Sequence, residues 1–332
     1  MKIKHILLAL LLLIVFIPTF LYVFSLDLSK KHSKKISQLA LYPSNTDTGQ
    51  FRLKANGLEF VVRVAGMQNK GKCVILLHGF PESSIMWENI MVKLAQEGYR
   101  VLAFDQRGYS PNARPSKIED YELNKLSEDV LAVAKAVGFE RFHLVGHDWG
   151  AVVGWKVVMD NPNLIDTWTA LSIPHIGAFF DGVVNDSIQK KRSGYFKFFK
   201  TPFLPEFLLT YRNQKNMKGL LAALPKKDFD ETISILAEQG ALTAELNWYR
   251  AMNVEEYAKN KTFSKKITTP TLFIWGKKDL VIAEKVIKNQ EIYFDSNLKT
   301  IALNTGHNLV QQQEKEVFDA ILAHWKKKNS LT

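Results

Sequence analysis

A turn with a carboxylate at its centre is the stretch of the sequence that points most directly to chemistry. An apolar run at residues 142–147 leads into Gly146-His147-Asp148-Trp149-Gly150. Glycines two places before and after a central residue are typical of the sharp strand-to-helix turn that exposes a nucleophile, which is usually serine. Here the central residue is Asp148. A carboxylate is suited to displacing a leaving group from an sp³ carbon, because the product is an alkyl ester that can serve as an intermediate.

A nucleophile at such a turn needs a base and an acid that orients the base, and later parts of the chain supply both. Asp279 follows the apolar run at 271–276, and His307 follows the run at 300–304. The chain order nucleophile, acid, histidine is the order of the triad on sheets that carry this turn. We therefore predict that Asp148, Asp279 and His307 are catalytic, with His307 activating water.

A second loop, HGFPE at residues 78–82, predicts the groups that stabilise negative charge. It follows an apolar run, and Pro81 indicates a tight turn, since an X-Pro bond can be cis. We predict that the backbone N–H groups of Phe80 and Trp149 converge on an oxyanion, where each such donor contributes a factor of about 10²–10³. A plain strand-to-helix turn is the alternative interpretation of this loop.

The elements that must position these residues alternate between strands and helices. Residues 51–66 predict a hairpin that turns at Asn56-Gly57. Short apolar runs, typical of buried parallel strands, lie at 73–79, 100–105, 142–147, 167–173, 271–276 and 300–304. Helical patterns lie at 84–97, 122–137, 149–160, 281–289 and 313–328. This alternation predicts an α/β fold with a doubly wound, mostly parallel sheet of eight strands.

The alternation is interrupted between residues 175 and 267. This stretch is aromatic and basic, has a helical composition and lacks a clear strand pattern. We predict a helical cap at 176–267 that covers the carboxyl ends of the strands, where such sheets bind ligands. The core is then divided into residues 51–175 and 268–332.

An apolar segment near the start of the chain predicts a membrane anchor. Residues 6–26 contain no charged side chain, and a helix of that length, about 32 Å, crosses a bilayer core. We predict a single-pass anchor within residues 1–28 and a polar tether at 29–50. A cleaved signal peptide is the alternative, and it would make the protein secreted or periplasmic. Lysines flank both ends of the segment and leave its orientation open.

The charge of the chain is basic, with 44 Lys and Arg residues against 33 Asp and Glu residues. No recognition-helix or zinc-finger spacing accompanies it, so nucleic acid is not a predicted partner. Two basic clusters stand out, at 30–35 beside the apolar segment and at 190–200; each is either solvated surface or a contact to anionic lipid. We predict no metal and no cofactor, because metal-ligand spacings and glycine-rich phosphate loops are lacking.

Together these motifs resemble those of epoxide hydrolases in the α/β-hydrolase superfamily. The matching stretches are HGFPE (78–82), DQRGYSPNARP (105–115), GHDWGA (146–151), NWYR (247–250), Asp279 and TGH (305–307). The apolar N-terminus is similar to that of membrane-anchored members. The resemblance implies an α/β-hydrolase fold with a helical cap and the hydrolysis of a small apolar epoxide to a vicinal diol through an ester on Asp148.

The resemblance also implies two cap tyrosines that hold the epoxide oxygen. Tyr249 stands in NWYR, and Tyr195 stands in YFKFF at 195–199. Tyr211 is the alternative to Tyr195 as the earlier of the two tyrosines. The residues predicted to contact substrate are His78, Pro81 and Trp248. For His78, as for His147 and His175, packing and supporting hydrogen bonds are the competing interpretation.

Two alternatives use the same fold. Haloalkane and fluoroacetate dehalogenases share the first three motifs and the aspartate nucleophile, but the former usually carry Asn in place of Phe80 and the latter carry Arg in place of Trp149. A non-catalytic ligand-binding protein is the other alternative, and the intact triad argues against it. Neither the particular epoxide nor the oligomeric state is predicted.

Overall fold

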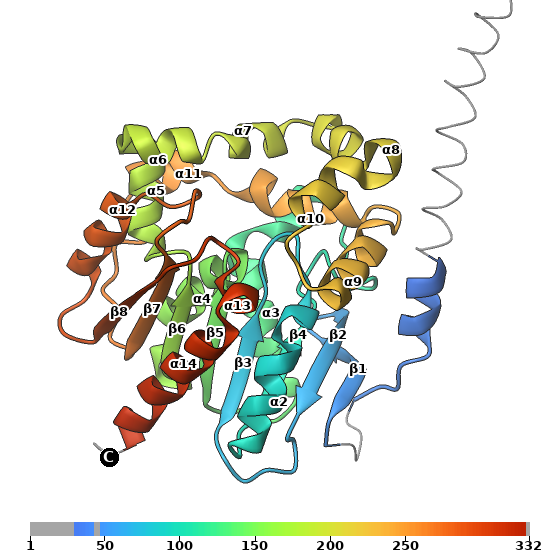
Figure 1. Ribbon diagram of the computed structural model, residues 1–332, viewed down its shortest axis with the longest axis horizontal. Coiled ribbons are helices and arrows are strands. Elements are labelled where there is room, and N and C mark those ends of the chain that lie inside the picture. Colours follow the sequence, from blue (N-terminus) through green and yellow to red (C-terminus); the bar gives the residue numbers. More distant parts are fainter. Residues whose placement is uncertain (1–29, 43–46, 330–332) are drawn as a thin grey trace, which may run out of the picture.

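An eight-stranded sheet forms the centre of the structure, a computed structural model that describes residues 30–42 and 47–329 (Figure 1). The strands are β1 (Gly49–Ala55), β2 (Leu58–Ala65), β3 (Cys73–Leu77), β4 (Arg100–Phe104), β5 (Phe142–His147), β6 (Ile165–Leu171), β7 (Thr271–Gly276) and β8 (Leu298–Leu303). Their order is β1-β2-β4-β3-β5-β6-β7-β8. The pairs β1-β2 and β2-β4 are antiparallel, and the other neighbours are parallel, which confirms the predicted sheet.

The predicted hairpin is present at the antiparallel edge of the sheet. Ala55 of β1 pairs with Leu58 of β2, so that Asn56 and Gly57 alone form the turn. Both turn residues have positive φ, 48° and 73°. A two-residue turn of this kind matches the twist of the flanking strands, and Asn-Gly is its preferred sequence.

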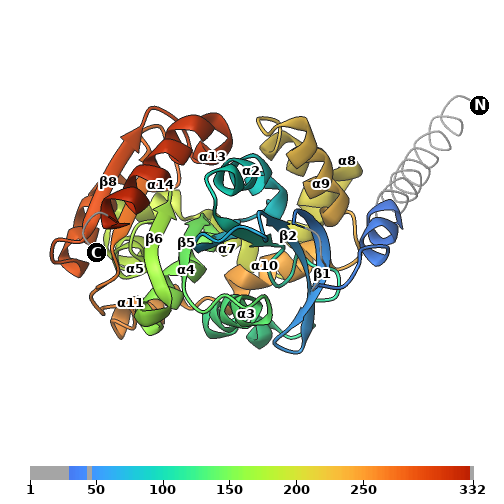
Figure 2. The same ribbon diagram turned by 90° about the horizontal axis from the view of Figure 1, so that it is seen from below.

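Helices cover both faces of the sheet, as Figure 2 shows from below. On one face lie α2 (Glu88–Gln96) and α14 (Glu314–Asn329), and on the other lie α3 (Leu123–Ala136) and α4 (Trp149–Asp160). In β3, Ile75 packs on the face of α3 and α4, whereas Val74 and Leu76 pack on the face of α2 and α14. Successive side chains of a strand point to opposite faces, so strands buried on both faces are apolar throughout.

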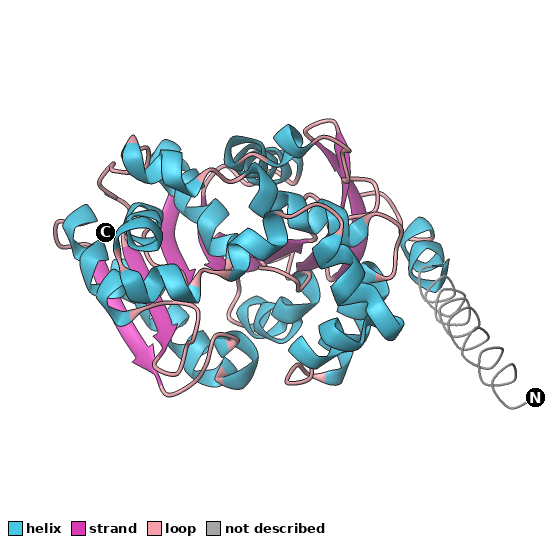
Figure 3. Ribbon diagram, turned by 90° about the horizontal axis from the view of Figure 1, so that it is seen from above, coloured by secondary structure: helices cyan, strands magenta, loops and turns pink. Residues whose placement is uncertain are grey.

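The chain between β6 and β7 forms a helical insertion above the carboxyl ends of the strands (Figures 1 and 3). Its helices are α5 (Ile176–Asn185), α6 (Ser187–Arg192), α7 (Tyr195–Lys200), α8 (Leu204–Leu220), α9 (Lys226–Leu236), α10 (Ala241–Ala251) and α11 (Val254–Lys259). Ion pairs fasten it to the core, and two of them are largely buried: Arg63 Nη2 lies 2.5 Å from Glu231 Oε1, and Arg114 Nη1 lies 2.6 Å from Glu238 Oε2. The predicted helical cap is therefore present.

Shorter elements complete the connections around the sheet. The 3₁₀ helices are η1 (Ser84–Trp87), η2 (Ile118–Tyr121), η3 (Pro162–Leu164) and η4 (Gln290–Tyr293), and the remaining helices are α12 (Glu284–Asn289) and α13 (Leu309–Gln312).

A helix precedes the sheet, in a region for which composition predicted only a polar tether. Residues 30–37, the leading helix, are helical and pack against the cap. His32 is buried, with Nδ1 2.8 Å from Glu238 Oε1, and the Ser33 hydroxyl donates to the same carboxylate oxygen. The predicted anchor at residues 6–26 lies outside the described residues. Within the part that the structure does describe, no helix is long and apolar enough to cross a membrane.

We predict opposite effects for alanine at two helical glycines. A Cβ atom on Gly154 of α4 would lie 2.1 Å from Cη2 of the buried Trp168 ring, whereas a Cβ atom on Gly219 of α8 would meet nothing within 4 Å. Gly154→Ala should therefore lower the free energy of unfolding by about 1–3 kcal/mol despite the better helix propensity of alanine. Gly219→Ala, the matched control, should leave it unchanged or raise it by up to about 1 kcal/mol. Urea unfolding of both variants provides the measurement, and equal effects would contradict the packing argument.

Candidate active site

The turn that carries Asp148 has the geometry that its flanking glycines predict. Asp148 joins β5 to α4 with φ 51° and ψ −121°, a conformation that non-glycine residues rarely adopt. A Cβ atom on Gly146 would lie 2.4 Å from the Gly150 carbonyl oxygen, and one on Gly150 would lie 2.3 Å from the Leu77 carbonyl oxygen. Only glycine fits at both positions. Close packing on both sides thus holds the strained backbone of Asp148, as is common at functional sites.

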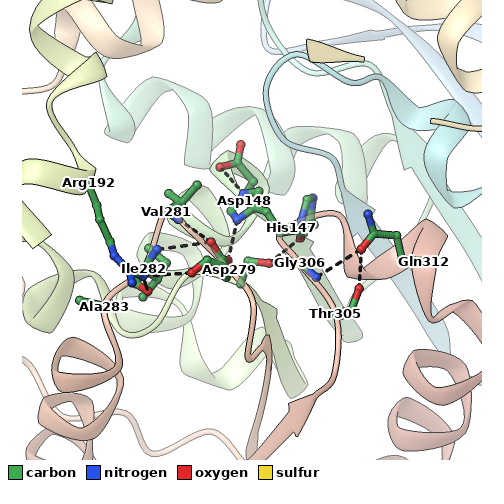
Figure 4. A network of polar contacts seen from close by, with 12 residues as sticks. His147, Asp148, Arg192, Asp279, Val281, Ile282, Ala283, Thr305, Gly306 and Gln312 are labelled. Atoms are coloured by element: carbon green, nitrogen blue, oxygen red, sulfur yellow. Dashed lines mark hydrogen bonds and ion pairs between the residues drawn. The ribbon is translucent and has the colours of Figure 1, made fainter. Parts of the chain in front are cut away.

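The structure brings Asp148, Asp279 and His307 together from the loops after β5, β7 and β8. His307 Nδ1 lies 2.7 Å from Asp279 Oδ2, and His307 Nε2 lies 3.3 Å from Asp148 Oδ2. The other oxygen of Asp279 accepts hydrogen bonds from the backbone N–H groups of Val281 and Ile282, at 2.6 and 3.4 Å (Figure 4). Asp279 is therefore fixed in place and orients the imidazole toward Asp148.

Two backbone N–H groups face the carboxylate of Asp148. The N–H of Phe80 donates to Asp148 Oδ1 at 2.8 Å, and the N–H of Trp149 also donates to this carboxylate. The peptide bond between Phe80 and Pro81 is cis. The two backbone donors predicted from the sequence thus both donate to the carboxylate of Asp148.

The electrostatics of the site centre on His307. Burial alone would lower its pKa, but the charge of Asp279 and the hydrogen bonds and charge of Asp148 raise it to about 10. Burial likewise would raise the pKa of Asp148, but the hydrogen bond and charge of His307 outweigh burial and leave it below its usual value. The free site therefore holds an imidazolium between two carboxylates at neutral pH.

A second histidine supports the main chain of His307. His147 Nε2 lies 2.9 Å from the carbonyl oxygen of His307, and the Ser172 hydroxyl donates to the same oxygen at 3.0 Å. Burial, followed by the charge of His307, lowers the pKa of His147 to about 4. His147 consequently stays neutral and acts as a hydrogen-bond donor that positions its neighbour.

The cap places Tyr195 and Tyr249 over this carboxylate. The Tyr249 ring is 2% exposed, with its centroid 4.9 Å from that of Trp149 and 6.1 Å from that of Tyr195. Burial is the main cause that raises the pKa of both tyrosines well above the usual value, and the charge of Asp148 adds to it. Both hydroxyls therefore keep their protons. Tyr211 belongs to α8, but its side chain lies outside the described part of the structure.

A narrow, largely apolar cavity adjoins Asp148 and Tyr195. Its lining consists of Asp148, Trp149, Val152, Ile173, Phe179, Phe180, Tyr195, Phe196 and Met252. The apolar members outside the motifs were not identified from the sequence, because a phenylalanine at helical spacing has the same pattern whether it faces a core or a cavity.

Two residues predicted to contact substrate form hydrogen bonds to the main chain of neighbouring loops. His78 is fully buried, with Nδ1 3.1 Å from the Gly79 carbonyl oxygen and Nε2 accepting from the Gln106 N–H at 3.0 Å. Trp248 is 1% exposed and donates its indole N–H to the Arg107 carbonyl oxygen at 2.8 Å. Neither belongs to the cavity lining. Both side chains thus hold the loops beside the site in place, and their contact with substrate stays a prediction.

Sequence reasoning missed a contact from the cap to the loop of Asp279. Arg192 of α6 donates from Nη1 to the carbonyl oxygen of Asp279 at 3.0 Å and also to that of Ile282 (Figure 4). Gln189 of the same helix donates to the Val281 carbonyl oxygen and accepts from the Ala283 N–H, at 2.9 and 2.8 Å. The basic cluster at 190–200 thus contains one arginine that points inward.

Glu82 of the HGFPE loop was also missed. It is 4% exposed and accepts a hydrogen bond from the Gln311 side chain, four residues after His307. Burial, with the charge of Asp228 as the next cause, raises the pKa of Glu82 to about 8. Glu82 is consequently a neutral acid through most of the neutral range. Its position at the end of the HGFPE motif was the one feature of the sequence that could have identified it.

Comparison with known proteins assigns the chain to a family. The family model of the alpha/beta hydrolase fold matches residues 72–311. Epoxide hydrolase 4 of Mus musculus is 28% identical over 282 residues, which cover 82% of this chain and 77% of that protein. Epoxide hydrolase 3 of Xenopus tropicalis is 30% identical over 281 residues, which cover 81% and 75%.

A solved structure agrees with the fold. The structure of Bacillus megaterium epoxide hydrolase in complex with an inhibitor matches with a TM-score of 0.75 at 23% identity, and the match covers 83% of this chain and 99% of that one. The family model and the sequence relatives both extend over most of the chain. The chain therefore belongs to the α/β-hydrolase superfamily and, within it, to the epoxide hydrolase family.

Proposed function

We propose that the protein converts an epoxide and water into a vicinal diol through a covalent ester on Asp148. The observation that carries this proposal is a carboxylate at the nucleophile turn, backed by His307 and Asp279 and covered by Tyr195 and Tyr249. The names of the relatives support the same reaction. A carboxylate nucleophile requires an electrophilic sp³ carbon, and a strained ring with an oxygen leaving group provides one.

In the first half-reaction, Asp148 attacks a ring carbon and the carbon–oxygen bond of the ring breaks. The new bond is an ester, and the ring oxygen becomes an alkoxide that needs a proton. Tyr195 and Tyr249 supply that proton, since burial keeps both hydroxyls protonated. Positioned acid catalysis of this kind contributes about 10²–10⁴-fold.

In the second half-reaction, His307 becomes a base. Esterification removes the charge of Asp148, one of the two carboxylates that raise the pKa of His307. The imidazolium can then give up its proton, which restores the tyrosine, and accept one from a water molecule. The resulting hydroxide attacks the ester carbonyl, the N–H groups of Phe80 and Trp149 stabilise the oxyanion, and diol and carboxylate separate.

The cavity lining favours an apolar epoxide as the substrate, and the uncharged N-terminal segment favours a membrane as the location. The cavity wall is formed mainly by aliphatic and aromatic side chains, which favours an apolar substituent beside the epoxide. Residues 6–26 supply an uncharged segment of bilayer length. We propose that this segment anchors the protein.

A stalled intermediate tests the nucleophile, the base and the substrate class together. His307→Gln should open the epoxide once and then remain esterified on Asp148, because glutamine cannot accept the proton from water. Intact-protein mass spectrometry should show the mass of the whole epoxide added, whereas a haloalkane would add its mass less the halogen. Asp148→Asn, the control, should form no adduct. Normal turnover by His307→Gln, or an adduct on another residue, would refute the mechanism.

Phenylalanine substitutions test the proton donors. Tyr195→Phe and Tyr249→Phe should each slow ester formation, and the double variant should lose about 10²–10⁴-fold in single-turnover rate. Thermal unfolding should change little, because the rings and their contacts are kept. Tyr257→Phe serves as a matched control on α11, since Tyr257 packs on Phe180 but does not line the cavity beside Asp148. A wild-type rate in the double variant would contradict the prediction and would show that both tyrosines serve only in packing.

The pKa of His307 offers a test that needs no substrate. Asp148→Asn removes one of the two negative charges that hold this pKa at about 10, so the pKa should fall. Histidine titration by nuclear magnetic resonance measures it in both proteins. Because the raised pKa keeps His307 protonated, ester hydrolysis in the wild type should accelerate as the pH rises. Ester formation should persist at lower pH, because the pKa of Asp148 is lowered. An unchanged His307 pKa would contradict the proposed switch from acid to base.

A further inference from the structure

The outer side of the cap exposes a cluster of large apolar side chains. Of the twelve exposed large hydrophobic residues in the described ranges, six lie on or beside α6 and α8: Ile188, Phe203, Leu204, Phe207, Leu208 and Leu220. Phe203 is 83% exposed and Phe207 is 60% exposed. Four of the six fall within the six residues 203–208, where Leu204, Phe207 and Leu208 share one side of a helix. Concentrated exposure of this kind marks an interaction surface.

The same helices are strongly basic. Residues 187–220 contain eight Lys and Arg residues and one acidic residue, Glu206. That single carboxylate lies 2.8 Å from the guanidinium of Arg250. Lys190, Lys191 and Lys197 are exposed. Apolar side chains flanked by lysines complement a bilayer with anionic headgroups, where the apolar groups enter the interface and the lysines attract the phosphates.

The described chain begins on the cap. His32 and Ser33 of the leading helix bind Glu238 of the cap, and Figure 1 shows this helix beside α9. Leu26, the last residue of the uncharged segment, is four residues before Lys30. Four extended residues span at most about 14 Å. A segment held in a bilayer would therefore keep the leading helix, and the cap bonded to it, close to the same bilayer.

We propose that the outer face of the cap, formed by α6, α7 and the first turns of α8, docks onto the surface of an anionic lipid bilayer. Phe203, Leu204 and Phe207 enter the interface, and Lys190, Lys191 and Lys197 contact phosphate groups. Figure 1 shows these helices along the edge of the molecule farthest from the amino ends of the parallel strands. The helix α7 carries Tyr195 over the catalytic cavity, so docking would set that cavity close to the lipid. Docking rests on the proposed anchor at residues 6–26 and on the surface of the cap, and it does not require the proposed reaction.

A fluorescent probe on the full-length chain tests the docking. Cys73 is buried, so Phe203→Cys supplies an accessible thiol for an environment-sensitive dye. The protein is incorporated into vesicles of phosphatidylcholine, with or without phosphatidylserine, that contain a quencher on the acyl chains. We expect a blue shift and quenching only with phosphatidylserine. Leu164→Cys is the matched control, because Leu164 is also exposed but precedes β6 at the opposite end of the sheet.

Charge reversal tests the lysines. The triple variant Lys190→Glu, Lys191→Glu and Lys197→Glu in the Phe203→Cys background should lose most of the quenching, since each lysine near an anionic surface contributes about fivefold to partition. The control triple reverses the exposed lysines Lys54, Lys70 and Lys299 and changes net charge equally. It should leave quenching unchanged.

Three outcomes would overturn the proposal. They are a probe that stays in water in both vesicles, quenching that is independent of phosphatidylserine, and equal loss in the two triple variants. A blue shift that grows with protein concentration in detergent, without vesicles, would also overturn it and would assign the face to contact between copies of the chain.

Discussion

A protonated imidazole held between two carboxylates is the interaction on which the rest of the structure depends. His307 contacts Asp279 at 2.7 Å and Asp148 at 3.3 Å, and none of these side chains is near another in the sequence. Three loops at the carboxyl ends of β5, β7 and β8 must therefore be placed together. The charges of these groups also stabilise one another: each carboxylate raises the pKa of His307, and the imidazolium lowers the pKa of Asp148. In the proposed reaction, ester formation on Asp148 would remove one of the charges that raise the pKa of His307.

Asp148, Asp279 and His307 are each positioned by further contacts outside the group of three. Asp148 is fixed by the glycine-packed turn, and the main chain of His307 by His147 and Ser172. The loop of Asp279 is held from the cap, through Gln189 and Arg192. Because α6 supports this loop and α7 carries Tyr195, a displacement of the cap would disturb Asp279 together with Tyr195. Residues of the cap thus support a loop of the core, although the two parts are separate segments of the chain.

Buried ion pairs extend this coupling away from the site. Glu238 receives Arg114 from the core and His32 from the leading helix, so one cap carboxylate joins three segments. Removing one partner from such a group leaves a buried charge without compensation, which costs more than the pair contributes. The start of the described chain, the cap and the core therefore form one connected unit rather than a tethered domain.

The sequence by itself determined the order of the elements, the hairpin turn at Asn56-Gly57, and the identity and chain order of Asp148, Asp279 and His307. These depend on local rules: alternation in strands, helical periodicity and the backbone freedom of glycine. Only the tertiary structure decided which of several similar side chains face the site. His78 and Trp248 turn to the main chain, and Arg192 points inward beside exposed lysines. Composition and spacing do not specify which of several similar side chains will contact a distant segment. The side that each residue faces, and the pKa that results, are set when the segments pack.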